Sequence, residues 1–399
     1  MSAHENKILA ADRTRNIKYA IRDISVLAHQ VARQGAEMRY LNIGDPMAFD
    51  FRTPPHIVDA IHRGMLEGDT GYAPTEGIPI AIDAIRRQEQ HKGIDNICQI
   101  CVTTGASEGI ELALTALINP GEKVLLPSPG YPLYPAVLAK IGGIPNPYYL
   151  DEDAGWQPDT ADIEAKIDDK TRAVVIINPN NPTGSLASDE TLEEIVEIAK
   201  RHNLVIFADE IYDKILFNGE KHTSIASLSG DHPCVTFSGL AKSYLGPGLR
   251  LGWAVISGDS DRVSDFSEGF MKMARARLCS STPTQWAIPA ALDGDQSHLT
   301  SMISRLEKRA DLVTARLNAI DGFRCVRPRG AFYAFPSIDF PGTDTAFVTR
   351  LIQETGVVTV PGSGFGQRPD TKHLRIVFLP PESCLEEALD RIENFAKYY

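Results

Sequence analysis

The sequence has 399 residues, 43% of them apolar, which is enough to bury a large core and favours more than one domain. Its formal net charge is -12 at pH 7, from 40 Lys and Arg against 52 Asp and Glu. A surface that binds nucleic acid or an anionic membrane needs clustered positive charge, so this composition argues against both. The expected partners are small molecules and other protein chains.

The N-terminal stretch "MSAHENKILAADRTR" has scattered charges and no apolar core typical of a signal peptide. No apolar stretch is long enough to span a bilayer, so we expect a cytoplasmic protein. Of the six cysteines only Cys98 and Cys101 are close in sequence, without the second pair or spaced histidines that a zinc site needs. We therefore expect no metal site and reduced thiols.

Short apolar runs that end in turn residues predict buried strands. In chain order they are "QICVTTGAS", "KVLLPSPGY", "RAVVIINPNNPTG", "LVIFADEIY" and "CVTFSGLAK". Helical patterns lie between them, and the clearest, "SDETLEEIVEIAKRH", has acids in its first turn and bases in its last. Strand alternating with helix predicts an α/β fold with a mostly parallel sheet covered on both faces.

The C-terminal third has a different character. From about His298 a charged helical stretch, "LTSMISRLEKRADLVTARLNAI", leads into short strands within "CVRPRGAFYAFP", "GVVTVPG" and "HLRIVFLP", and then into a final helix. This pattern predicts a smaller α+β domain formed by residues 1–50 and 298–399. The large domain is expected to comprise residues 51–297.

Several unusual residues, most of them polar, follow the ends of the predicted strands. These residues are Gly105, Ala106, Ser107, Tyr131, Asn181, Asp209, Tyr212 and Lys242. Ligands of open α/β sheets bind at the carboxyl ends of the strands, so we expect these residues to share one edge. Arg250 precedes its strand, "RLGWAVI", and reaches that edge only if this strand runs antiparallel to the others.

Lys242 lies among small and apolar residues in "SGLAKSYLGPGLRLGW", and the nearest fixed charge along the chain is another cation, Arg250. An amine in a cleft can form a Schiff base with an aldehyde, and the aldehyde cofactor suited to this setting is pyridoxal 5'-phosphate. Its phosphate would bind the loop at residues 105–107, which opens a helix, together with Arg250. Asp209 suits the pyridine nitrogen, and Asn181 and Tyr212 suit the phenolate oxygen.

Each of these residues also has a purely structural interpretation. Asp209 could be a turn residue or a helix cap, "NPNNPTG" a simple turn, Arg250 a surface ion-pair partner, and Tyr131 an interior aromatic rather than the ring that stacks on the cofactor. "GSGFG" at 362–366 resembles a dinucleotide loop, but no βαβ unit surrounds it. The combination of residues, and no single one, indicates the cofactor site.

The motifs "NPNNPTG", "ADEIYDKI" and "GLAKSYLGPGLRLGW", in this order and spacing, resemble the fold-type-I pyridoxal-phosphate aminotransferases of the aspartate aminotransferase superfamily. The resemblance runs from "YLNIGDP" to "HLRIVFLP". It implies a large domain with a mostly parallel seven-stranded sheet covered by helices on both faces, plus a smaller α+β domain. It makes Lys242 the Schiff-base lysine and the proton carrier, with Asp209 and Tyr212 as further catalytic residues.

The resemblance also implies the remaining contacts. The phosphate would be bound by Gly105, Ala106, Ser107 and Arg250, and the substrate by Arg375, which clamps the α-carboxylate, with Gly44, Asn181 and Tyr131. Tyr72, in "GYAPTEG", matches a residue that reaches the neighbouring subunit's phosphate, so a homodimer is expected. Many relatives have Ser or Thr where this chain has Gly239, and Ser238 is a candidate substitute.

The expected mechanism is a two-stage exchange in which the freed amine of Lys242 moves a proton from the α-carbon to the cofactor. Several stretches look most like bacterial alanine aminotransferases, which pair alanine with 2-oxoglutarate, while the lysine segment resembles tyrosine aminotransferases as well. An aspartate or aromatic donor therefore stays open. So do a carbon–sulfur lyase or decarboxylase and a regulator that binds the cofactor without catalysis.

Overall fold

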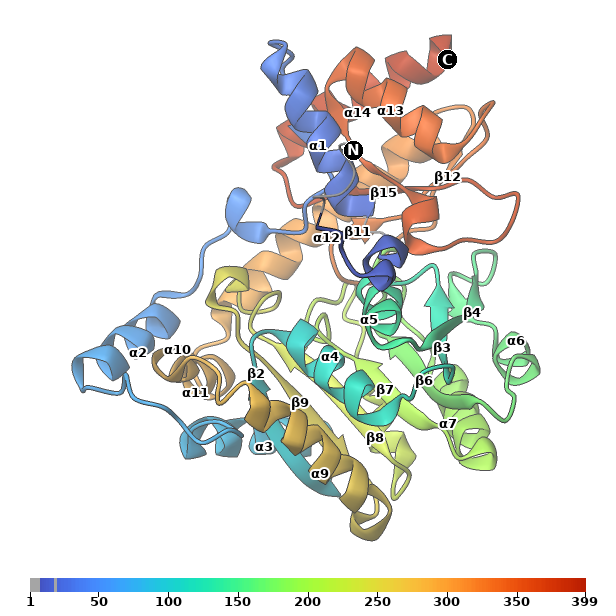
Figure 1. Cartoon of the computed structure of the whole chain (residues 1–399). Helices are drawn as coiled ribbons and strands as arrows, with labels where there is room; N and C mark the ends of the chain where they lie inside the picture. Colours follow the sequence, from blue (N-terminus) through green and yellow to red (C-terminus); the bar gives the residue numbers. More distant parts are fainter. Residues whose placement is uncertain (1–7, 18–19) are drawn as a thin grey trace, which may run out of the picture.

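In the computed structural model, which describes residues 8–17 and 20–399, eight strands form one large sheet (Figure 1). In spatial order they are β2 (Ile97–Thr103), β9 (Gly252–Ser257), β8 (Cys234–Gly239), β7 (Val205–Asp209), β6 (Thr171–Ile177), β3 (Lys123–Ser128), β4 (Ile144–Asp151) and β5 (Gln157–Pro158). Pairing is parallel from β8 through β4. β9 runs antiparallel to both β2 and β8, which is the direction that the position of Arg250 requires.

The α/β fold and the five predicted strands are confirmed. The sheet contains the two-residue edge strand β5 beyond the seven strands expected. β4 has no apolar run in the sequence because Pro145 and Pro147 interrupt it. These prolines are two residues apart, so their nitrogens face the same side, and along residues 144–149 β4 pairs only with β3. The side without a partner strand tolerates residues that cannot donate a hydrogen bond.

Helices cover both faces of the sheet. Side chains alternate along β6, so Val174 and Ile176 join one buried cluster while Ala173, Val175 and Ile177 join another. One face packs against α4 (Ala106–Leu117), α5 (Leu133–Ile141) and α9 (Ser260–Ala276). The other packs against α6 (Thr160–Ala165), α7 (Asp189–His202) and α8 (Ile225–Ser229). The β2 and β9 end is covered by α2 (Pro55–Leu66), α3 (Pro79–His91) and α11 (Ala287–Asp293), and α10 (Thr282–Gln285) packs against α2.

The rest of the chain forms a smaller layer above the sheet (Figure 1). Its helices are α1 (Ala20–Arg33), α12 (Ser297–Asn318), α13 (Asp344–Thr355) and α14 (Glu382–Tyr398). Its strands are β1 (Arg39–Tyr40), β10 (Phe323–Arg324), β11 (Tyr333–Ala334), β12 (Ser337–Ile338), β13 (Val357–Val358), β14 (Val360–Pro361) and β15 (Leu374–Val377). N-terminal and C-terminal residues share one apolar core here, and β1 pairs with β13. Division of the chain at residues 50 and 297 stays a prediction.

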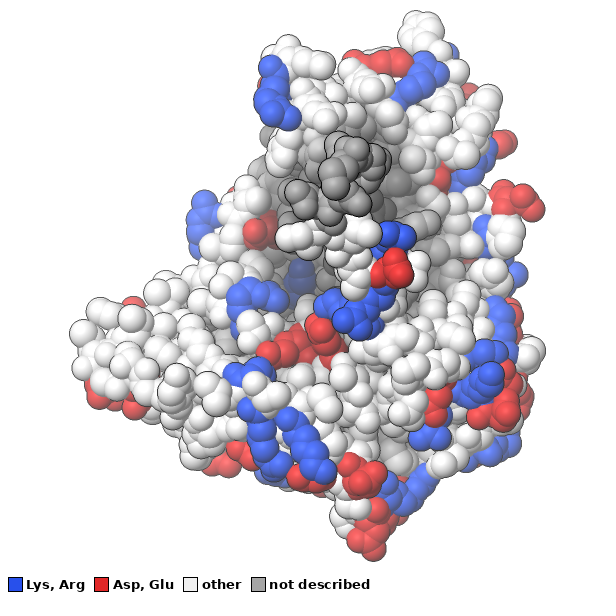
Figure 2. Space-filling model, in the orientation of Figure 1, with Lys and Arg blue, Asp and Glu red and all other residues white. Residues whose placement is uncertain are grey.

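Four short 3-10 helices complete the described chain: η1 (Asp12–Asn16), η2 (Pro46–Ala48), η3 (Pro247–Leu249) and η4 (Gly362–Phe365). Among the described helices none is long and apolar enough to cross a membrane. Figure 2 shows one face of the molecule, on which Lys and Arg alternate with Asp and Glu instead of gathering in one basic patch.

Candidate active site

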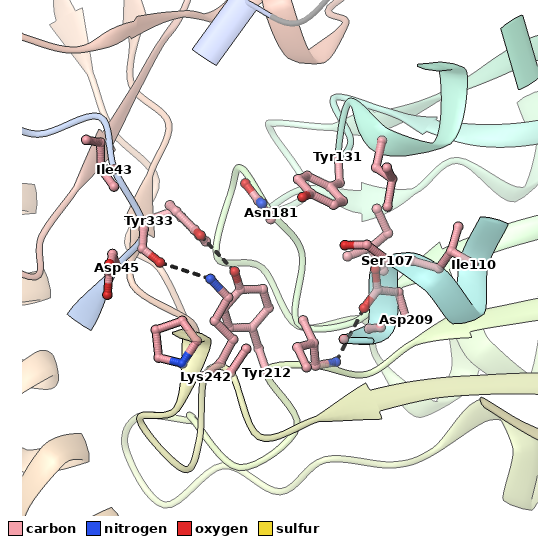
Figure 3. A pocket seen from close by; sticks show the side chains of 18 of the residues that line it. Ile43, Asp45, Ser107, Ile110, Tyr131, Asn181, Asp209, Tyr212, Lys242 and Tyr333 are labelled. Atoms are coloured by element: carbon pink, nitrogen blue, oxygen red, sulfur yellow. Dashed lines mark hydrogen bonds between the residues drawn. The ribbon is translucent and has the colours of Figure 1, made fainter. Parts of the chain in front are cut away.

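A cavity of about 650 Å³ opens at the carboxyl edge of the sheet, where the smaller layer meets it (Figure 3). Strands β2, β6, β7 and β8 all end at this edge, so their following residues converge although they are far apart in sequence. The structure brings most of the predicted site residues into the cavity lining: Gly44, Gly105, Ala106, Ser107, Tyr131, Asn181, Asp209, Tyr212, Lys242, Arg250 and Arg375.

Lys242 follows β8, and its amine lies in the middle of the cavity (Figure 3). The Nζ atom donates to the backbone oxygen of Gly44 at 2.9 Å and lies 5.8 Å from the centre of the Tyr212 ring. Burial and the neighbouring Arg375 lower the pKa of Lys242 to about 8, although Asp45 opposes the shift. A lysine with this pKa has an accessible neutral form, and the neutral amine is the nucleophile.

Asp209 ends β7 and is buried. Its carboxylate accepts from the Tyr134 hydroxyl at 3.3 Å and from the backbone N–H of Ile211 at 3.4 Å. Burial raises the pKa of Asp209 to about 6, and these two hydrogen bonds oppose the rise only in part. Both bonds are long, so this carboxylate has acceptor capacity for a stronger, cationic donor from the cavity.

The N-terminus of α4 is a candidate anion site. Gly105, with a φ of 75°, precedes this helix, and a side chain there would place its Cβ 2.5 Å from Nη2 of Arg250. The Arg250 guanidinium donates to the backbone oxygens of Thr104 and Pro247 at 3.4 and 3.1 Å. Within the described chain no carboxylate lies at ion-pair distance from Arg250. Helix N–H groups beside this cation suit a phosphate.

A second guanidinium lies on the opposite side of the cavity. Arg375 in β15 is 2% exposed, and its two terminal nitrogens donate to Asn181 Oδ1 at 3.3 Å and to the backbone oxygen of Asn42 at 2.6 Å. The rings of Tyr333 and Phe365 lie 4.8 and 4.6 Å from its central carbon. Such a fixed, planar guanidinium is suited to bidentate binding of a carboxylate.

Comparison with known proteins decides between the chemistries that this geometry permits. The family described as aminotransferase class I and II matches residues 37–392. The chain belongs to this family. It is 40% identical to the alanine aminotransferase of Mycobacterium tuberculosis over 93% of this chain and 88% of that protein. It is also 40% identical to a glutamate-pyruvate aminotransferase of Haemophilus influenzae, over 98% of each.

Among solved structures, the alanine aminotransferase of Pyrococcus furiosus superposes with a TM-score of 0.94 at 39% identity, covering 98% of this chain and 100% of that one. The protein is an aminotransferase of this family, and its cofactor is pyridoxal 5'-phosphate. The cofactor and family predicted from the sequence are thus confirmed.

Two residues of this aminotransferase's cavity region were missed by the sequence analysis. The hydroxyl of Tyr333 lies 2.7 Å from the hydroxyl of Tyr212. A Cβ added to Gly44 would lie 2.5 Å from the Tyr333 hydroxyl. Tyr333 lies in "GAFYAFP", which indicates only a short buried strand. Tyr134, which donates to Asp209, comes three residues after Tyr131. Tyr131 precedes the helix α5, in which Tyr134 lies, so helical spacing gave no signal for Tyr134.

Two predicted residues are not brought into the cavity lining. Ser238 is buried in β8 opposite Trp253, and at Gly239 a Cβ would lie 2.7 Å from the backbone oxygen of Leu251. This close approach explains why position 239 is glycine instead of Ser or Thr. Tyr72 is 87% exposed and lies outside its own chain's cavity. The roles of Ser238 and Tyr72 stay predictions.

Proposed function

We propose that this enzyme exchanges an amino group between alanine and 2-oxoglutarate, with Lys242 as its catalytic base. The observation that carries the proposal is the lysine of lowered pKa in a cavity that also contains a buried carboxylate and two guanidinium groups. The choice of alanine is supported by similarity to alanine and glutamate-pyruvate aminotransferases over nearly the whole chain.

The residues present fit pyridoxal phosphate. Lys242 would attach to its aldehyde, and Arg250 with the N-terminus of α4 would bind its phosphate. Asp209 would accept a hydrogen bond from the protonated pyridine nitrogen, which matches a buried carboxylate whose present hydrogen bonds are long. Tyr131 is suited to stack on the ring and Asn181 to donate to its phenolate oxygen. When bound, the cofactor supplies a conjugated ring that takes up the electrons released at the substrate's α-carbon.

The protein's own groups then bind the substrate and move its proton. Arg375 binds the α-carboxylate through its terminal nitrogens, near the backbone of Gly44. A substrate bound there would lie in the same cavity as the Lys242 amine, which is 2.9 Å from the Gly44 oxygen. An amine whose pKa is close to neutrality both accepts and returns a proton efficiently, so Lys242 suits each half of the exchange. Tyr212, paired with Tyr333, lies beside this amine.

Absorbance spectra of the holoenzyme with single amino acids test the choice of donor. Alanine and glutamate are each expected to convert the cofactor's absorbance within one half-reaction, while aspartate and tyrosine react at least about tenfold more slowly, since a methylene is worth roughly 1–3 kcal/mol in such pockets. Faster reaction with aspartate or tyrosine would overturn the alanine assignment. Release of ammonia or carbon dioxide, with no new amino acid formed from the added keto acid, would instead indicate the lyase or decarboxylase.

A homodimer is also part of the proposal. Met65, Leu66 and Tyr72, in and just after α2, are 54%, 73% and 87% exposed, which is unusual for a group of large apolar side chains. A second copy would cover them and place its Tyr72 beside the phosphate site. Light scattering of the purified protein tests this, and a monomer at micromolar concentration would contradict it. The cytoplasmic location remains a prediction, which the six unpaired cysteines support.

A further inference from the structure

A buried group of charged side chains lies next to the residues proposed to bind the cofactor. This Lys92 cluster consists of Lys92, Glu89, Glu210 and Asp213. The Lys92 amine is 2.8 Å from an oxygen of Asp213, 3.3 Å from Glu210 and 3.4 Å from Glu89. The three carboxylates are almost entirely buried, and the Lys92 side chain is 12% exposed. None of these residues lines the cavity.

The cluster is joined to the site through the segment that follows β7. Glu210 comes directly after Asp209, and Asp213 comes directly after Tyr212. In this turn the backbone N–H of Asp213 donates to the backbone oxygen of Glu210 at 3.0 Å. Asp209 and Tyr212 line the cavity, whereas Glu210 and Asp213 contact Lys92, which follows the end of α3. One cation from another part of the chain thus binds the same turn at two points.

Charge balance makes this arrangement unusual. Burial would lower the pKa of Lys92, but its three carboxylate partners raise it well above the ordinary value. Burial raises the pKa of Glu89, which Glu210 and Asp213 raise further. Buried ion pairs seldom give net stability, whereas removal of one partner leaves an uncompensated charge. A function in fixing the charge and position of the turn accounts for such a group better than stability does.

We propose that Lys92 is a positioning residue for the aminotransferase reaction, which fixes the turn at residues 209–213 and compensates the acids on it so that Asp209 is ionised at neutral pH. The inference rests on the proposed role of Asp209. Glu210 already raises the pKa of Asp209. Without Lys92 the acids on this turn would lose the cation closest to them, and like charges favour the protonated acid. A protonated Asp209 is neutral, so it would no longer stabilise the positive charge of a protonated pyridine nitrogen.

Other groups also face the cluster and enter its charge balance. They are Trp253 in β9, which donates to Glu89 at 3.3 Å; Ser224, which donates to Glu210 at 2.6 Å; and Lys214, His222, Cys234 and Tyr244. Asp209 itself faces Tyr134 and Lys242. Among the described residues, Lys92 is the cation within 4.0 Å of Glu89, Glu210 and Asp213, so its removal is the most direct perturbation.

The test uses the holoenzyme and three variants. Lys92→Met removes the positive charge, Asp213→Asn removes one negative charge, and Lys92→Arg keeps the charge. For each, the acid limb of the pH profile of kcat/KM with alanine and the pH dependence of the bound cofactor's absorbance are measured, with thermal unfolding as a check on folding. Lys92→Met is expected to move the acid limb up by about 0.5–1 pH unit, and Asp213→Asn to move it down. Lys92→Arg should leave it in place.

Opposite shifts cannot come from a general loss of packing, which would lower the rate at every pH. Unchanged midpoints, or midpoints that move in the same direction in both variants, would overturn the inference. If Lys92→Met does not fold, Asp213→Asn is compared with Lys92→Arg. The inference then requires that the acid limb moves down in Asp213→Asn and stays in place in Lys92→Arg. Failure of the wild type to transaminate alanine would overturn the proposed function instead, so the two failures are distinct.

Discussion

The two guanidinium groups of the cavity are held in opposite ways. Arg250 is exposed, has a left-handed backbone with a φ of 51°, and contacts backbone oxygens beside a helix N-terminus. Arg375 is 2% exposed, lies between two aromatic rings and donates to Asn181. Strained backbone is common where a bound group is to be held, while a rigid side chain suits a ligand that arrives and leaves in each cycle. We infer that Arg250 serves the cofactor and Arg375 the substrate.

Lys242 lies between these two regions, and its loss should have the largest effect. Both guanidinium groups contribute to its lowered pKa. Lys242→Ala should reduce transamination by at least about 100-fold, because the proton carrier is removed. Rates of the alanine half-reaction measured by stopped flow check this, and added methylamine should restore part of the rate. A near-normal rate in the variant would refute the role.

The next largest effect is expected at Arg375, whose loss should impair substrate use but not cofactor binding. Arg375→Ala should lower kcat/KM for alanine by roughly 100-fold, since two charge-assisted hydrogen bonds of about 1.5 kcal/mol each are lost. The affinity for pyridoxal phosphate should stay within about twofold of that of the wild type. Steady-state kinetics at saturating cofactor, together with cofactor titration, provide both numbers. A large loss of cofactor affinity would show that the assignment is reversed.

Arg250→Ala is the matched change on the cofactor side. The dissociation constant of pyridoxal phosphate should rise about 10-fold to 100-fold, because one charged contact to the phosphate is lost while the α4 N-terminus remains. At saturating cofactor the KM for alanine should change little. Equilibrium dialysis of the apoprotein checks the first statement and initial rates the second. The comparison fails if the alanine KM rises more than the cofactor dissociation constant.

The smallest effect concerns the stability of the apoprotein. The folded-state pKa of Asp209 is raised to about 6 by burial, above its ordinary value of 3.8. Such a group destabilises the folded state above pH 6, and this penalty disappears as the pH falls toward 4. Asp209→Asn should therefore stabilise the apoprotein by about 3 kcal/mol at pH 7.5 and by much less at pH 4. Urea unfolding at both pH values measures this, and a gain that grows toward acid would contradict it.

Short apolar runs in the sequence were sufficient to predict the parallel sheet and the residues at the ends of its strands. Asp209, Asn181 and Lys242 each follow an apolar run, so topology alone places them at one edge. The position of Arg250 also followed from the direction of one strand. Tyr333 and the Lys92 cluster were not predictable in this way. Tyr333 is more than a hundred residues from Tyr212, and Lys92 is as far from Glu210 and Asp213. β4 was missed because Pro145 and Pro147 interrupt its apolar pattern. These prolines are tolerated because most of β4 pairs with a neighbouring strand on one side only.

The most direct test of this account is borohydride reduction of the native holoenzyme followed by peptide mass spectrometry. Reduction fixes the cofactor to the amine that binds it. We expect one pyridoxyl group per chain, on Lys242. A pyridoxyl group on another lysine, or a chain with no such group, would contradict the central claim.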